Sequence, residues 1–249
     1  MTNAFERHGI GHLSASSLNL FAAQPAIWVM QRLLKKSGPV GAAAHRGTAA
    51  ETGIVHGLLN PNASADECRV MALRQYDTLT ALSGDPKRVK EGEAVPAIVS
   101  TALPELRGYG VPDEVQQRIE VTLPEVPVPF LGFADLGWSN HGITLDIKTT
   151  LRLPSSIATP HARQVALYLY GTNREGRIAY CTPAKVAVYR LEDAADHLAA
   201  LVNIAQRLER FLAVSNDPQE LAGIVVPDID SFYVNDPITR THVRETFGL

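Results

Sequence analysis

Two aspartates and a lysine are close together on a segment whose pattern predicts a β-hairpin. Asp135 precedes a turn at residues 139–142, and Asp146 and Lys148 follow it. If the residues that flank the turn pair with each other, Asp135 is directly opposite Asp146, with Cβ atoms about 4.5–5.5 Å apart. Lys148 shares the face of Asp146 because side chains alternate along a strand. Opposed carboxylates beside an ammonium predict a divalent-metal site for phosphate chemistry, and the alternative is a surface hairpin with a solvated Asp–Lys pair.

Three more polar side chains are candidates for the same site. Glu51 falls on the apolar stripe of a helix predicted for residues 42–59, where a buried carboxylate is costly unless it meets a cation or hydrogen-bond donors. The alternative is a glutamate at the edge of the stripe that reaches water. Gln164 and Tyr168 are i,i+4 neighbours on a later helix and together can hydrogen-bond a phosphate, a water or Lys148. The alternative for this pair is ordinary decoration of an amphipathic helix.

The predicted secondary structure that must position these residues changes from helices in the first half of the chain to strands and helices in the second. Capping residues, prolines and apolar periodicity predict helices in the first half, starting at the capping serines Ser14, Ser16 and Ser17 and continuing over about residues 26–34, 42–59, 65–82 and 94–106. Period-two patterns in the second half predict strands at about residues 115–123, 129–138, 143–149, 177–182 and 185–191. Further helices are predicted at about residues 161–171 and 193–214, followed by a tail with a short helix and an irregular acidic stretch. This order predicts one α/β domain with a helical N-terminal part.

Composition narrows the functional classes. The chain has 249 residues, 45% of them hydrophobic, and a formal net charge of −3, which is typical of a globular protein without a global basic field. Positive charge confined to one groove remains compatible with nucleic-acid binding. Cys68 and Cys181 are far apart, so we expect neither a disulfide framework nor a zinc site, and a reducing cytosolic setting. No signal pattern or membrane-length apolar stretch is found, so no membrane partner is expected.

The order and spacing of these residues resemble the PD-(D/E)XK nuclease superfamily, in particular its RecB-like branch with bacteriophage exonuclease relatives. The matching segments, spread over most of the chain, are residues 13–18 with 24–25, 46–51, 132–135 and 146–150, and the pair Gln164 and Tyr168. Two positions depart from the pattern. The branch usually carries His where this chain has Glu51, and Glu there is more similar to phage exonucleases. The cysteines of the iron–sulfur members are missing, with Gln24 before Pro25, so no iron–sulfur cluster is expected.

The resemblance implies a fold and an activity. The implied fold is α/β, a restriction-endonuclease-like core with a central mixed β-sheet flanked by helices. It is expected as a single nuclease domain over residues 1–249, with a mostly helical part (1–110), a catalytic core (111–215) and a C-terminal tail (216–249). The implied activity is Mg²⁺-dependent hydrolysis of DNA phosphodiester bonds, with Mn²⁺ as a substitute and exonuclease action as the expected mode. The implied context is recombination, repair or phage DNA processing.

The resemblance also assigns roles to individual residues. The implied metal ligands are Glu51, Asp135, Asp146 and the backbone carbonyl of Ile147. Lys148 would position the attacking water or stabilise charge in the transition state, and Gln164 and Tyr168 would support the phosphate and the lysine. The candidate contacts to the DNA backbone are Arg46, Lys87, Arg88, Arg152 and Arg163.

The implied partner is DNA, and a single-strand annealing or recombination protein is a further candidate partner. The expected location is the cytoplasm of a bacterium or of a phage-infected host cell. One alternative is a catalytically inactive DNA-binding or interaction module that retains the nuclease fold. Another is a metal-dependent hydrolase that uses the same residues on RNA or nucleotides.

Overall fold

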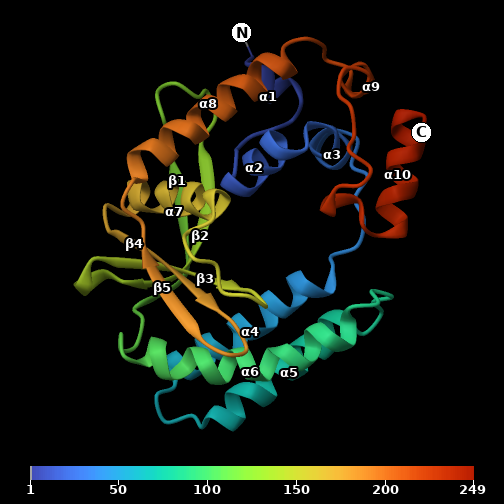
Figure 1. Ribbon diagram of the computed structural model, residues 1–249. Coiled ribbons are helices and arrows are strands. Elements are labelled where there is room, and N and C mark those ends of the chain that lie inside the picture. Colours follow the sequence, from blue (N-terminus) through green and yellow to red (C-terminus); the bar gives the residue numbers. More distant parts are fainter. Residues whose placement is uncertain (1) are drawn as a thin grey trace. The chain divides into compact units, whose positions relative to one another are not determined.

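A computed structural model describes residues 2–249 and has the predicted α/β architecture (Figure 1). Its sheet has five strands in the order β1-β2-β3-β4-β5. The strands are β1 (Glu114–Val121), β2 (Phe130–Trp138), β3 (Ile143–Thr149), β4 (Glu175–Cys181) and β5 (Val186–Arg190). β3 runs antiparallel to β2 and parallel to β4, and β4 and β5 are antiparallel, so the sheet is mixed as predicted. None of the helices within residues 2–249 has the length and apolar character needed to cross a lipid bilayer.

The chain forms two compact units. The sheet unit comprises Val40–Arg118 and Phe133–Glu192. The terminal unit comprises residues 2–39 together with Ile119–Gly132 and Asp193–Leu249. Strands β1 and β2 each continue from one unit into the other. All the candidate site residues named above, from Glu51 to Tyr168, belong to the sheet unit. The organisation as a single nuclease domain stays a prediction.

Three helices form one layer of the sheet unit: α4 (Ala42–Leu59), α5 (Ala65–Thr80) and α6 (Arg88–Arg107). The bounds of α4 agree with those predicted, and α5 begins at a capping box made by Ser64 and Glu67. Helix α6 begins at Arg88, earlier than the predicted Ala94. The Asp85 carboxylate accepts hydrogen bonds from the backbone N–H groups of Lys87, just before α6, and of Ala42, the first residue of α4, each at 2.8 Å.

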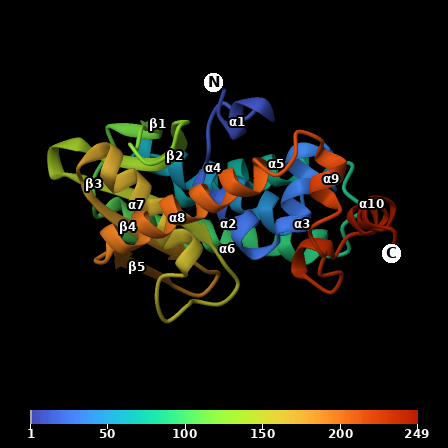
Figure 2. The same ribbon diagram turned by 90° about the horizontal axis from the view of Figure 1, so that it is seen from above.

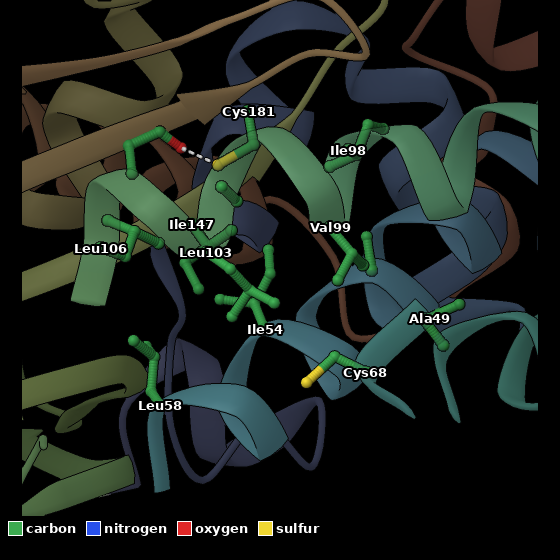
Figure 3. Close-up of a cluster of buried hydrophobic side chains, with 14 of the residues drawn as sticks. Ala49, Ile54, Leu58, Cys68, Ile98, Val99, Leu103, Leu106, Ile147 and Cys181 are labelled. Carbon is green, nitrogen blue, oxygen red and sulfur yellow. Dashed lines mark hydrogen bonds between the residues drawn. The ribbon is translucent and has the colours of Figure 1, made fainter. Parts of the chain in front are cut away.

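The core of the sheet unit lies between this helical layer and one face of the sheet. Figure 3 shows Ile147 of β3 and Cys181 of β4 near Ile54 of α4 and Leu103 of α6, and all four side chains are buried. Because side chains alternate along a strand, Asp146 and Lys148 of β3 point to the opposite face. Helix α7 (Thr159–Thr172) packs against β3 and β4 and covers that face (Figure 1).

The terminal unit is mostly helical. Its elements are α1 (Ala4–Arg7), α2 (Ala15–Ala23), α3 (Pro25–Trp28), the π-helix η1 (Val29–Leu33), α8 (Ala194–Leu212), α9 (Pro218–Ala222), the 3-10 helix η3 (Phe232–Val234) and α10 (Pro237–Phe247). Helix α2 packs against α8, and Figure 2 shows the two side by side. The Phe21 ring lies 5.5 Å from Trp28 and 5.6 Å from Phe211, centroid to centroid. The sequence prediction omitted α1 and α10, although Asp236 before Pro237 is an N-cap signal for α10.

Candidate active site

The hairpin has the predicted register. Trp138 pairs with Ile143 across a short 3-10 turn, η2 (Ser139–His141), that Gly142 closes with a left-handed φ of 63°. Continuing this register places Asp135 against Asp146, one step beyond the last ladder pair. At this step the Asp135 side chain joins the two strands, because its Oδ2 accepts a hydrogen bond from the Ile147 backbone N–H at 2.7 Å. The Asp135 carboxylate is therefore held against β3.

The two hairpin carboxylates and the lysine are buried together. Asp146 is 1% exposed and Asp135 is 9% exposed. Burial raises the pKa of Asp135 well above its ordinary value, and the negative charges of Asp146 and Glu51 raise it further. Burial alone would lower the pKa of Lys148, but the neighbouring carboxylates, with Asp146 foremost, raise it. One ammonium thus faces three carboxylates, and the excess negative charge attracts a cation.

The Asp146 carboxylate has a partner on only one of its two oxygens. Its Oδ2 lies 2.7 Å from Lys148 Nζ and forms an ion pair with it. Its buried Oδ1 accepts no hydrogen bond from the residues that the structure describes. Buried polar groups are hydrogen-bonded in the great majority of cases, so Oδ1 needs another partner. Carboxylate oxygens are the hard ligands that Mg²⁺ prefers, and the donor chemistry therefore fits a divalent cation.

Glu51 joins the hairpin through a residue that the sequence analysis missed. Gln116 of β1 donates from Nε2 both to Glu51 Oε1 and to Asp135 Oδ1, the latter at 3.0 Å. Burial raises the pKa of Glu51, and the hydrogen bond from Gln116 opposes this shift. The Glu51 carboxylate of α4 therefore lies beside the hairpin. Gln116 was not predicted, because a glutamine in a strand gives no signal of such a role. Within residues 2–249, no three His, Cys, Asp or Glu side chains converge as a complete metal-binding group.

Helix α7 brings the predicted Gln164–Tyr168 pair to the same face. Gln164 Nε2 donates to Tyr168 Oη at 2.7 Å, so the i,i+4 neighbours are in contact as expected. Tyr168 is buried, and burial together with the negative charge of Asp146 raises the pKa of its phenol. The phenol therefore keeps its proton at neutral pH and remains a potential donor beside Asp146.

A histidine–tyrosine pair borders Lys148 on its other side. Tyr180 of β4 pairs with Lys148 of β3 in the parallel register. The Tyr180 hydroxyl is 2.8 Å from His161 Nδ1 and accepts a hydrogen bond from the Ala158 backbone N–H at 3.0 Å. Burial and the positive charge of Lys148 lower the pKa of His161. Tyr180 was not predicted, because the pairing of β3 with β4 joins segments separated by α7.

Arg46 contacts two other elements of the sheet unit. It is 7% exposed, forms an ion pair with Glu91 of α6, and donates from Nη2 to the Thr149 backbone oxygen at 3.0 Å. The guanidinium is thus engaged within the protein, and a phosphate contact by Arg46 stays a prediction. Lys87 and Arg152 are exposed, as a backbone contact requires.

Comparison with known proteins adds little to this geometry. No protein-family model and no curated protein sequence matches the chain. Among solved structures, the chain is similar to one described as "Crystal structure of SSO0001", with 18% identity and a TM-score of 0.36. The match covers 64% of this chain and 82% of that one. A similarity this low has no bearing on function.

Proposed function

We propose that the protein is a metal-dependent nuclease that hydrolyses DNA phosphodiester bonds, with exonuclease action as the expected mode. The observation that carries the proposal is the buried Asp146, whose Oδ1 has no hydrogen-bond partner among the described residues while its Oδ2 pairs with Lys148 and Asp135 lies beside it. A divalent cation would satisfy this oxygen and offset the excess negative charge. The ordered motifs that resemble the PD-(D/E)XK superfamily support DNA as the substrate.

In this proposal the carboxylates hold the cation. Asp135 and Asp146 would bind Mg²⁺ from the two hairpin strands, with Glu51 and the carbonyl oxygen of Ile147 as further ligands. When bound, the cation neutralises phosphate charge and makes a water molecule more acidic. The hydrogen bond from Ile147 N–H fixes Asp135, so that this ligand is already oriented before the cation arrives.

Lys148 and Tyr168 would act on the phosphate. The negative charges around Lys148 keep its ammonium protonated, and its ion pair with Asp146 fixes its position. A preorganised cation stabilises the charge that develops on the phosphate as the nucleophile attacks. Tyr168 would hydrogen-bond a phosphate oxygen, with Gln164 holding the phenol in place.

The test is Mg²⁺-dependent digestion of end-labelled linear DNA beside closed-circular DNA. We compare the wild type with Asp146→Asn and Lys148→Ala, and with Asp77→Asn as a control at an exposed aspartate of helix α5 in the same unit. The wild type and the control should degrade linear DNA and spare closed circles, and each site variant should lose about 10²-fold or more in rate.

Undiminished activity in both site variants would exclude this assignment. Degradation of closed circles would show that the protein does not need a DNA end and acts as an endonuclease. Preferential degradation of RNA in a mixture would move the substrate from DNA to RNA. A wild type that neither cleaves nucleic acid nor binds Mn²⁺ would favour an inactive module that keeps the fold.

A further inference from the structure

Gln116 makes a contact that no sequence motif assigns. It is an exposed residue of β1, and its side-chain nitrogen lies between carboxylates of two other elements, Glu51 of α4 and Asp135 of β2. Carboxylate oxygens are acceptors only, so the amide must turn its N–H₂ group, and not its oxygen, toward them. Two N–H groups on one nitrogen supply one hydrogen bond to each carboxylate, and Gln116 thereby links the helix to the hairpin.

The backbone of Gln116 is unusual at the same position. Among residues 2–249, three non-glycine residues have a positive φ: Lys35, Gln116 and Asn173. Lys35 follows η1 and Asn173 ends α7, whereas Gln116, with a φ of 49°, lies inside a strand. This region is sterically unfavourable for a residue with a Cβ, and glycine would adopt it without strain. The position thus carries a side chain despite its backbone, and strain of this kind is concentrated at functional sites.

We propose that Gln116 is a positioning residue of the metal site, which holds the Glu51 carboxylate beside Asp135 so that both can bind one divalent cation. The inference depends on the proposed function, since it concerns the same site. Like charges on Glu51 and Asp135 repel, and the flexible Glu51 side chain would turn toward water without the amide. With the amide in place, Glu51 Oε2 remains available to a cation, while Ile147 N–H holds Asp135 on its other oxygen.

The experiment measures Mn²⁺ binding by calorimetry on the full chain, together with melting temperature. Gln116→Met keeps the length of the side chain and removes its donors, and Gln116→Gly also removes the backbone strain. Gln117→Met is the matched control, because the neighbouring glutamine donates to Glu114 Oε1 at 3.1 Å and not to the site. Both Gln116 variants should bind Mn²⁺ about 10–100-fold more weakly, the range for lost partners of metal ligands, and the control should bind as the wild type does.

The melting temperature separates positioning from a structural role. Gln116→Gly should melt at or above the wild-type temperature, because glycine relieves the positive φ, and yet bind Mn²⁺ weakly. A lower melting temperature with unchanged Mn²⁺ affinity would instead assign Gln116 a structural role and overturn the inference. Tight Mn²⁺ binding by both the wild type and Gln116→Met would overturn this inference alone, whereas a wild type without a Mn²⁺ site would overturn the proposed function as well.

Discussion

Two buried ionic groups of the sheet unit differ in their charge balance. In the first, Arg46 faces Glu91, with side chains 8% and 6% exposed, so one cation meets one anion. Arg46 also donates to the backbone oxygen of Thr149. In the second, the single ammonium of Lys148 faces the carboxylates of Asp135, Asp146 and Glu51. A balanced pair is compatible with a purely structural role, whereas an unbalanced group has a raised free energy that a bound cation would lower.

The two groups are connected through helix α4. Arg46 and Glu51 are both on this helix, little more than one turn apart. Arg46 anchors the helix to the end of β3 through Thr149, and Glu51 then reaches Gln116 and the hairpin. The balanced group therefore fixes the helix that supplies a carboxylate to the unbalanced one.

The largest expected effect comes from breaking the balanced group. Arg46→Met should lower the free energy of unfolding by about 3–5 kcal/mol, because it leaves the Glu91 carboxylate buried without its partner. Urea denaturation measures the loss. Lys36→Met is the control, since Lys36 pairs with Glu245 through side chains that are 36% and 59% exposed, and such surface pairs contribute about 0–1 kcal/mol. Equal losses in the two variants would remove the distinction between a buried anchor and a surface pair.

The next effect tests the unbalanced group by adding a divalent cation that would offset its excess negative charge. Mn²⁺ at 100 times its dissociation constant should stabilise the wild type by about 2.7 kcal/mol, since ligand binding to the folded state raises its stability by mass action. The measurement is thermal unfolding with and without Mn²⁺, and a chelator should reverse the shift. Asp146→Asn should not respond. Equal Mn²⁺ shifts in the wild type and Asp146→Asn would place the ion elsewhere.

Removing one negative charge from the unbalanced group should change how the stability of the fold depends on pH. The folded-state pKa of Asp135 is raised, so its ionised form lowers stability at neutral pH, and this penalty disappears as the pH falls through the raised pKa toward the ordinary value of about 3.9. Asp135→Asn removes this penalty, so its free energy of unfolding relative to that of the wild type should rise as the pH increases from about 4 toward 7. The loss from replacing an oxygen that accepts a hydrogen bond by an amide nitrogen does not depend on pH in this range.

The control is the same Asp→Asn substitution at a carboxylate whose pKa is lowered instead of raised. Hydrogen bonds from Ser139 lower the pKa of Asp113, so this carboxylate contributes stability above its ordinary pKa that is lost as the pH falls. Asp113→Asn should therefore destabilise the protein near neutral pH. Urea denaturation across the pH range compares the two variants. A stability of Asp135→Asn relative to the wild type that does not rise with pH would contradict the charge imbalance assigned to the site.

The smallest effect tests whether the unbalanced group extends to α7. Tyr168→Phe removes the acceptor of the Gln164 amide and should lower the free energy of unfolding by about 0.5–1.5 kcal/mol, the usual net value of one hydrogen bond. The rate of DNA hydrolysis should also fall if the phenol contacts the phosphate. Urea denaturation and single-turnover digestion measure the two effects. An unchanged rate would restrict the chemistry to the carboxylates and Lys148.

Local patterns were sufficient for the hairpin and for α4. Strand β3 and helix α4 have the predicted bounds, and Trp138 pairs with Ile143 as expected. These features depend on alternation, turn residues and helical periodicity, all of which act over a few residues. The α/β class followed from the same patterns. Helix α10 was missed because its only local signal was the Asp236–Pro237 cap next to an irregular acidic stretch.

The sequence by itself determined that Asp135, Asp146 and Lys148 share one face of a hairpin, since strand alternation and a short turn leave few other arrangements. Only the tertiary structure decided which distant groups meet them. In the structure Arg46 forms a buried ion pair with Glu91, and Gln116 links Glu51 to Asp135 through two hydrogen bonds. These contacts join residues far apart in the chain, and they depend on how helices pack against the sheet, which no local pattern of residues encodes.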